Sequence, residues 1–324
     1  MAQSDLLDIF INALHGKINK KSDLVNFVAD SLNIEKESAY RRLNRKVYFS
    51  ISEMGVLASK LGISIDGILK YKYGYTSPPT YVMYIPKTAQ SINDLIEKMR
   101  IDAMVLKDLS KGSTECGQTF NSLPIEFVIP YNNLLKFFYF KWGYYFVGSD
   151  GFNDFSSWKM PVNLISANET IVDVLKNLSS LTYLWDMSSI WCLAKDIAYF
   201  QSIYALTIDD VEVLKYELHR MLYDMEKVAE GISINYFDST KIQIYISTIH
   251  LGMHFTYFIS DSKWYSSFHT YFVGSNYSDD HETCTQTRDW MNSMKKVCTL
   301  ISNSGAKERR LFFGEQHKIV DNIN

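Results

Sequence analysis

The chain has 324 residues, of which 47% are hydrophobic and 21% are charged, a composition that excludes a long disordered protein. Its net charge of −3 alone argues neither for nor against a nucleic-acid partner. The charge is unevenly divided: residues 1–74 contain 11 basic and 8 acidic side chains, and residues 75–324 contain 22 basic and 28 acidic ones. Residues 15–46 alone contain 8 basic and 4 acidic side chains, as expected if one module contacts phosphates.

No segment of the sequence has the pattern of a secretion signal or a membrane span. The N-terminal "MAQSDLLDIF" is acidic and lacks a charged region followed by an apolar one. The most apolar run, residues 134–148, contains two lysines and is too short to span a bilayer comfortably. The cysteines are scattered and form no CxxC pair: Cys116, Cys192, Cys284 and Cys298. We therefore expect a cytoplasmic protein with free thiols and no membrane partner.

The first 71 residues predict five short helices, each with apolar residues at helical spacing. Small polar residues stand where helices begin, and a glycine stands where one ends. The first expected helix covers residues 5–15 and is capped by Ser4, the second starts at Ser22, and the third covers residues 36–45. The fourth is opened by a capping box of Ser50 with Glu53 and ended by Gly62, and a short fifth helix is capped by Ser64. Together they predict one compact all-α domain, residues 1–71.

Residues 72–80 predict a linker, because a glycine and the pair Pro78-Pro79 end the helix and stiffen the chain. We expect one larger α+β domain over residues 81–324, for dimerisation or for sensing an unknown effector. Helices are expected at 91–109, 170–206, 207–231, 280–302 and 306–323, and two or three antiparallel strands at 241–274. Residues 132–146 predict either a buried helix or a pair of strands, since periodicity cannot decide between them.

The second and third expected helices have the pattern of a helix-turn-helix. Where the two helices cross, the first needs a small residue, and the turn needs a residue that tolerates left-handed backbone angles before an apolar one. Ala29, Asn33 and Ile34 occupy these positions, and the following helix would bury Ala39 and Leu43. The side chains left outside, within reach of base edges or phosphates in a major groove, are Lys36, Glu37, Tyr40 and Arg41. A basic helical hairpin can also be only a solvated surface.

The sequence "VADSLNIEKESAYRRLNRK" (residues 28–46), followed by "SISEMGVLASKLGISIDGIL" (residues 50–69), resembles the phage-repressor-like helix-turn-helix family, the Cro/C1 or XRE type. The resemblance covers residues 4–71, with Asn33 in place of the usual glycine of the turn. It implies a five-helix, lambda-repressor-like domain that binds double-stranded DNA as a homodimer. The tail, residues 282–323, also resembles the ends of uncharacterised regulators from Bacteroides-type bacteria, which brings no known chemistry.

The same resemblance implies roles for individual side chains. Lys36, Glu37 and Arg41 fall where the recognition helix of the family reads bases, and Tyr40 is a neighbour within reach of a base or a thymine methyl group. Phosphate contacts are implied for Arg42, Arg45 and Lys46. Ser22 stands where a glutamine often begins the second helix, and its hydroxyl could still donate to a phosphate.

Three histidines in the larger part of the chain are candidate metal ligands. His250 and His254 lie on one side of "HLGMH", and His269 follows on the next expected strand, so the three could form a zinc or iron site. No carboxylate stands at a supporting spacing, and "HETC" at residues 281–284 lacks the second histidine of HExxH. We therefore assign no metal ligand, no catalytic residue and no cofactor, since GxGxxG, GxxxxGK[ST] and GxSxG are also absent.

We expect a sequence-specific DNA-binding transcriptional regulator, not an enzyme, with a recognition helix at about residues 36–45 in the major groove. The alternative left open is an enzyme directed to nucleic acid, such as a metal-dependent nuclease or hydrolase that uses the helix-turn-helix for targeting. A third reading, an adaptor that binds protein through the same fold, fits the local basicity less well.

Overall fold

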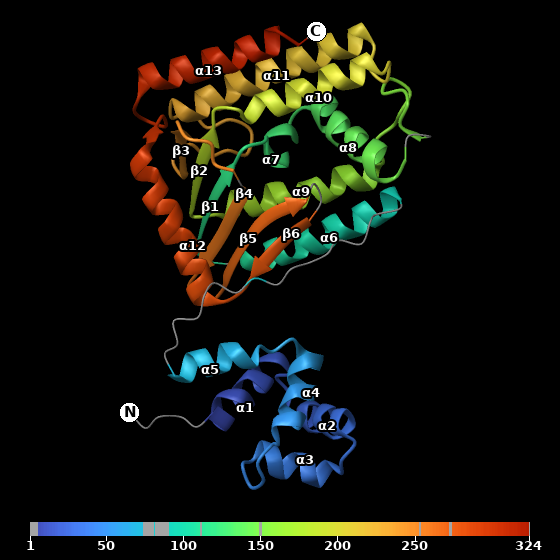
Figure 1. Cartoon of the computed structure of the whole chain (residues 1–324), viewed down its shortest axis with the longest axis vertical. Coiled ribbons are helices and arrows are strands. Elements are labelled where there is room, and N and C mark those ends of the chain that lie inside the picture. Colours follow the sequence, from blue (N-terminus) through green and yellow to red (C-terminus); the bar gives the residue numbers. More distant parts are fainter. Residues whose placement is uncertain are drawn as a thin grey trace. The chain divides into compact units, whose positions relative to one another are not determined.

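The computed structural model describes residues 6–73, 81, 91–110, 112–148, 151–252, 254–271 and 274–323. The chain divides into two units, residues 1–78 and 79–324, called unit 1 and unit 2 (Figure 1). Unit 1 is helical, and unit 2 combines helices with a mixed sheet, in agreement with the expected all-α and α+β parts. Most of the linker expected at residues 72–80 lies outside the described residues.

Unit 1 contains the five short helices that the sequence predicts. They are α1 (Leu6–Lys17), α2 (Lys21–Leu32), α3 (Lys36–Leu43), α4 (Ile51–Leu61) and α5 (Ile65–Tyr73). The capping box of Ser50 and Glu53 is present, and Gly62 ends α4 with φ of 60°. The Ser64 hydroxyl accepts from the N–H of Gly67 at 3.0 Å. Ser4, the expected first cap, lies outside the described residues.

Several helix limits in unit 1 differ from the prediction, including the end of α1 at Lys17 instead of residue 15 and the end of α5 at Tyr73, inside the expected linker. Helix α2 begins at Lys21, after Lys20 as N-cap, so Ser22 lies inside the first turn. Helix α3 ends at Leu43, so the expected helix at residues 36–45 is too long. The difference arises because Arg45 takes a positive φ of 63°, which a continuing helix cannot contain.

The core of unit 1 is one apolar cluster to which all five helices contribute. Leu24 and Val28 of α2, Ala39 and Leu43 of α3, and Leu57 of α4 are buried in it. Since each helix has only one apolar stripe, this shared core fixes which side of each helix faces solvent.

Unit 2 is built on a seven-stranded sheet in the order β6-β5-β4-β1-β2-β3-β7. The strands are β1 (Thr114–Phe120), β2 (Ser180–Asp186), β3 (Ile242–Ser247), β4 (His254–Ser260), β5 (Trp264–Tyr271), β6 (Gly274–Ser278) and β7 (Cys298–Leu300). Strands β1, β2 and β3 are parallel neighbours, and the other pairs are antiparallel. Parallel neighbours need long crossovers, which here carry helices.

The helices of unit 2 lie on both faces of the sheet (Figure 1). They are α6 (Ile92–Leu109), α7 (Ile125–Val128), α8 (Asn132–Phe146), α9 (Val162–Asn177), α10 (Ser189–Ser202), α11 (Ile208–Ala229), α12 (His281–Met294) and α13 (Ala306–Asp321), with a 3-10 turn at Lys295–Val297. Tyr183 of β2 packs in the main core, whereas the next residue, Leu184, packs with Met291 of α12. Because successive strand side chains point to opposite faces, α12 covers the face opposite to the main core.

Four strands of unit 2 differ from the sequence-based expectation, among them β6, which lies almost entirely after the expected stretch 241–274. Strand β2 lies inside the expected helical stretch 170–206, β7 lies inside the expected helix 280–302, and β1 was not expected. Within the expected stretch 241–274, β4 and β5 pair antiparallel as predicted, whereas β3 pairs in parallel with β2 and does not neighbour β4. Residues 132–146 form a helix, α8, which decides the open alternative. None of the described helices is both long and apolar enough to cross a membrane.

Candidate nucleic-acid interface

The turn between α2 and α3 has the geometry that its sequence predicts. Asn33 adopts φ 51° and ψ 51°, in the left-handed region that asparagine tolerates better than most residues. The N–H groups of both Asn33 and Ile34 donate to the carbonyl oxygen of Ala29. Ala29 is only 4% exposed. Its small side chain therefore lies at the point where the neighbouring helix must approach α2 closely. Local chemistry therefore fixes the turn that carries α3.

Helix α3 presents polar and basic side chains on the side opposite to its buried residues. Ala39 and Leu43 are buried, and Tyr40 is 41% exposed. The exposed residues of the helix also include Lys36, Glu37 and Arg41. Among the described residues, these three side chains have no hydrogen-bond or ion-pair partner. They are therefore available to a ligand, as a recognition helix requires.

Arg42 is engaged within unit 1, although the family resemblance implies a phosphate contact. Its Nη2 lies 2.9 Å from Oε1 of Glu53, and the Arg42 side chain is only 19% exposed. Burial opposes ionisation of Glu53, but hydrogen bonds from the Ser50 N–H and from Arg42 lower the Glu53 pKa overall. Arg42 therefore joins α3 to the start of α4, a structural contact that the sequence did not predict.

The two basic residues that follow α3 remain accessible. The Nε of Arg45 is 2.6 Å from Oδ1 of Asp8 in α1, yet the Arg45 side chain is 57% exposed. Such an exposed pair contributes at most about 1 kcal/mol, so a phosphate can compete for the guanidinium. Lys46 is exposed. Ser22 is exposed at the start of α2, where its hydroxyl donates to Asp23 at 3.1 Å.

Two residues that sequence reasoning missed connect the start of α2 to α3. The Nζ of Lys21 donates to Oδ1 of Asn44 at 3.3 Å and lies 5.4 Å from the centre of the Tyr40 ring. Asn44 in turn donates to the carbonyl oxygen of Tyr40 at 2.7 Å. Lys21 thus adds a positive charge beside the outer face of α3. The sequence shows Lys21 directly before an apolar helical run, which marks it as a residue at the start of a helix. Its nearness to Tyr40, however, depends on how α2 and α3 cross.

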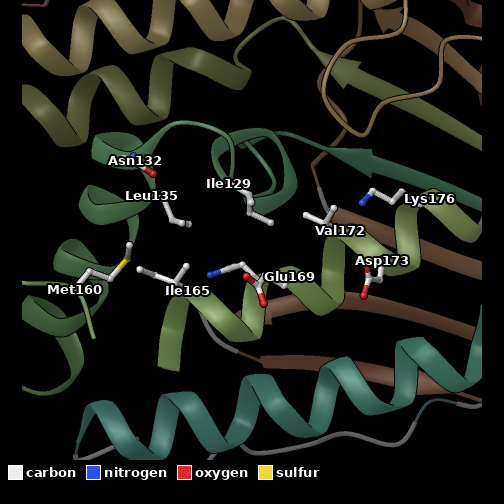
Figure 2. A pocket seen from close by; sticks show the side chains of 10 residues that line it. Ile129, Asn132, Leu135, Met160, Ile165, Glu169, Val172, Asp173 and Lys176 are labelled. Carbon is white, nitrogen blue, oxygen red and sulfur yellow. The ribbon is translucent and has the colours of Figure 1, made fainter. Parts of the chain in front are cut away.

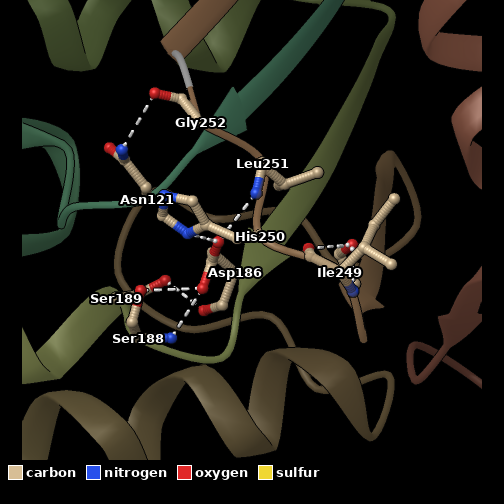
Figure 3. A network of polar contacts seen from close by, with 9 residues as sticks. Asn121, Asp186, Ser188, Ser189, Ile249, His250, Leu251 and Gly252 are labelled. Atoms are coloured by element: carbon tan, nitrogen blue, oxygen red, sulfur yellow. Dashed lines mark hydrogen bonds and ion pairs between the residues drawn. The ribbon is translucent and has the colours of Figure 1, made fainter.

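Two of the three candidate metal ligands of unit 2, His250 and His254, contact different partners. Figure 3 shows His250 beside Asp186, with its Nδ1 2.8 Å from the Asp186 Oδ2. The Nε2 of His254 is instead 3.3 Å from the hydroxyl of Thr256. The side chain of His269 lies outside the described residues, and no group of three metal ligands occurs among the described ones.

Asp186 fastens the loop that runs from β3 to β4. It is the last residue of β2, and its carboxylate accepts from the N–H groups of Ser188 at 2.8 Å and Leu251 at 2.9 Å, as well as from His250. Burial raises the pKa of Asp186, but these hydrogen bonds outweigh it and lower the pKa overall. Because an ionised carboxylate only accepts, His250 must donate from Nδ1. The His250 side chain is 68% exposed.

Unit 2 also has a hollow of about 370 Å³ between α9 and the region of α7 and α8 (Figure 2). Its apolar lining comes from Ile129, Leu135, Met160, Ile165 and Val172, and its polar lining from Asn132, Asn168, Glu169, Asp173 and Lys176. The volume lies within the range of small-molecule sites, which extends from about 300 to 1,000 Å³.

We compared the chain with protein-family models, with curated proteins and with solved structures, and none of the three comparisons finds a match. Function therefore has to be inferred from the geometry of the residues themselves, and the outer face of α3 is the most informative surface.

Proposed function

We propose that the protein is a sequence-specific DNA-binding transcriptional regulator whose unit 1 is a lambda-repressor-like domain of the XRE type. The observation that carries this proposal is the outer face of α3. Lys36, Glu37 and Arg41 have no side-chain partner among the residues that the structure describes, and they lie opposite the buried Ala39 and Leu43 on a helix held by a tight turn.

The chemistry of this face suits the major groove of double-stranded DNA. A guanidinium such as that of Arg41 can donate two parallel hydrogen bonds to O6 and N7 of guanine, and Lys36 can contact the same atoms. Tyr40 adds a ring for a thymine methyl group. The exposed residues Lys21, Ser22, Arg45 and Lys46 surround this face and are proposed to position it on phosphates.

We propose a homodimer in which unit 2 provides dimerisation or senses an unidentified effector. A single small module buries too little surface for operator-level affinity, and a two-fold symmetric DNA site requires two recognition helices. We place the protein in the cytoplasm, where it can reach chromosomal DNA.

The test is selection of binding sites from a pool of random DNA duplexes with the full chain. Successive rounds should enrich one motif, arranged as two inverted half-sites about one helical turn apart. Enrichment of no motif, with equal affinity for every duplex at each salt concentration, would overturn the proposal.

A further inference from the structure

Helix α11 has an outward face that carries large apolar side chains. Val213, Tyr216 and Tyr223 are 43%, 62% and 56% exposed. The opposite face of the helix, which includes Leu214 and Leu218, is buried in the core of unit 2. Tyr216 and Tyr223 are seven residues apart, so they lie on one side of the helix, as the contact positions of paired helices do.

Within the described part of unit 2, the neighbouring elements leave this outward face uncovered. On one side α11 contacts α13, where Nδ1 of His219 lies 2.7 Å from Nδ1 of His317. On the other side it contacts α8, where Oε1 of Glu217 accepts from the Asn133 side chain at 2.7 Å. At 100° per residue, Tyr216 projects between these two contact lines and away from the core.

Two opposite charges on the outward face stand at equal distances on either side of Tyr216. Glu212 lies four residues before Tyr216, and Arg220 lies four residues after it. Arg220 lies over the Tyr216 ring, 5.9 Å from its centre, and Glu212 is 65% exposed beside Lys215. If two copies of α11 pack antiparallel with a two-fold axis at Tyr216, Glu212 of each copy lies level with Arg220 of the other.

We propose that the outward face of α11 packs against the same face of a second copy of the chain, antiparallel, about a two-fold axis at Tyr216. In a two-fold symmetric pair every contact occurs twice, so two Glu212–Arg220 pairs form around a centre of apolar and aromatic side chains. Tyrosine and arginine are also enriched in protein interfaces. This inference rests on the dimeric state proposed above and names its surface.

The experiment is a charge exchange in the full chain without DNA, read as molar mass by sedimentation equilibrium over a micromolar concentration series. Glu212→Arg and Arg220→Glu should each weaken dimerisation by about tenfold or more, since each places like charges together twice. The double variant E212R/R220E restores opposite charges and should return the dissociation constant to near that of the wild type. Asp289→Arg, an exposed acid-to-base change on α12, is the control and should have no effect.

Three outcomes would overturn the inference: a monomeric wild type, a dimer that neither single exchange weakens, or a double variant no tighter than the single ones. Circular dichroism of each variant separates loss of pairing from loss of folding. DNA-site selection is measured separately, so a motif enriched by a protein that does not pair through α11 refutes this inference alone. Failure to enrich any motif with an α11 dimer intact refutes DNA recognition alone.

Discussion

Unit 1 and unit 2 differ in the range of the interactions that define them. In unit 1, neighbouring residues set the main features, such as the capping box of Ser50 with Glu53 and the left-handed turn at Asn33. In unit 2, β1 pairs with β2, and the register joins Glu115 to Ser180, more than sixty residues along the chain. Local patterns therefore define helices and turns well, whereas the order of strands in a sheet depends on contacts that no local pattern contains.

The two units also expose different chemistry. The outer face of α3 in unit 1 is polar and basic, whereas the outer face of α11 in unit 2 is aromatic with balanced charges. A basic face suits phosphates and bases, and an aromatic face with balanced charge suits protein. Variants that act on one unit at a time can therefore test this division.

The largest effect is expected from removal of a large core side chain. Phe127 is 1% exposed, and its ring lies 5.0 Å from that of Tyr183 and 5.4 Å from that of Trp185. Phe127→Ala should lower the free energy of unfolding of unit 2 by about 3–5 kcal/mol, because it leaves a cavity. Leu57→Ala should lower that of unit 1 by about 2–5 kcal/mol.

Urea unfolding, followed separately by signals from each unit, is the measurement for this pair. Each variant should shift one transition and leave the other unchanged. If both variants shift both transitions equally, the units unfold together and the division into two parts is wrong.

The next effect concerns pH and is confined to unit 2. Burial raises the pKa of Glu126 to about 7, so the folded state holds a proton that the unfolded state releases at lower pH. The stability of unit 2 should therefore fall as pH rises from the ordinary glutamate pKa to about 7, by up to about 3 kcal/mol. Glu126→Gln removes this titration and should be more stable than the wild type at about pH 8, with little difference at about pH 4.

The measurement is the free energy of unfolding of both proteins across this pH series. Parallel pH curves for the variant and the wild type would show that Glu126 does not titrate in this range. Because unit 1 lacks this residue, the pH dependence of its own transition should be the same in both proteins.

A smaller effect is expected from a change on α3. Arg41→Ala should cost about 1–3 kcal/mol of binding to the selected operator and relax specificity at one base pair in each half-site. Arg45→Ala and Lys46→Ala should instead weaken binding to all sequences similarly and reduce the salt dependence by about one unit per contact.

Binding of these variants to the operator and to random DNA across a salt series provides the check. Lys60→Ala, an exposed lysine near the end of α4, serves as the control. If Arg41→Ala binds both DNAs as the wild type does, α3 is not the helix that reads bases.

The smallest effect should come from a helix cap in unit 1. Ser50→Ala removes the hydroxyl that accepts from the N–H of Glu53 and should cost about 1 kcal/mol of unit 1 stability. Ser52→Ala, on the same exposed turn, is the matched control and should cost less. Thermal unfolding of unit 1 compares the two, and equal losses would mean that the cap adds nothing.

The helices and turns of this protein could be predicted from the sequence wherever nearby residues set the backbone. The turn at Asn33 follows from its tolerance of left-handed angles, and the outward position of Arg41 follows from the burial of Ala39 and Leu43. Helix α11 was predicted for the same reason, although it belongs to unit 2. Its local periodicity is strong, and one capping box opens it.

Contacts between distant parts of the fold set which segments became strands and which basic residues stayed accessible. Residues 180–186 form strand β2 because β1 and β3 pair with them on both sides, against the helical expectation for that stretch. Arg42 is held by Glu53 because α3 and α4 both pack against α2, which brings the two side chains together. Both results depend on partners distant in sequence, and the free energy of such pairing is set by the whole fold and not by local propensity.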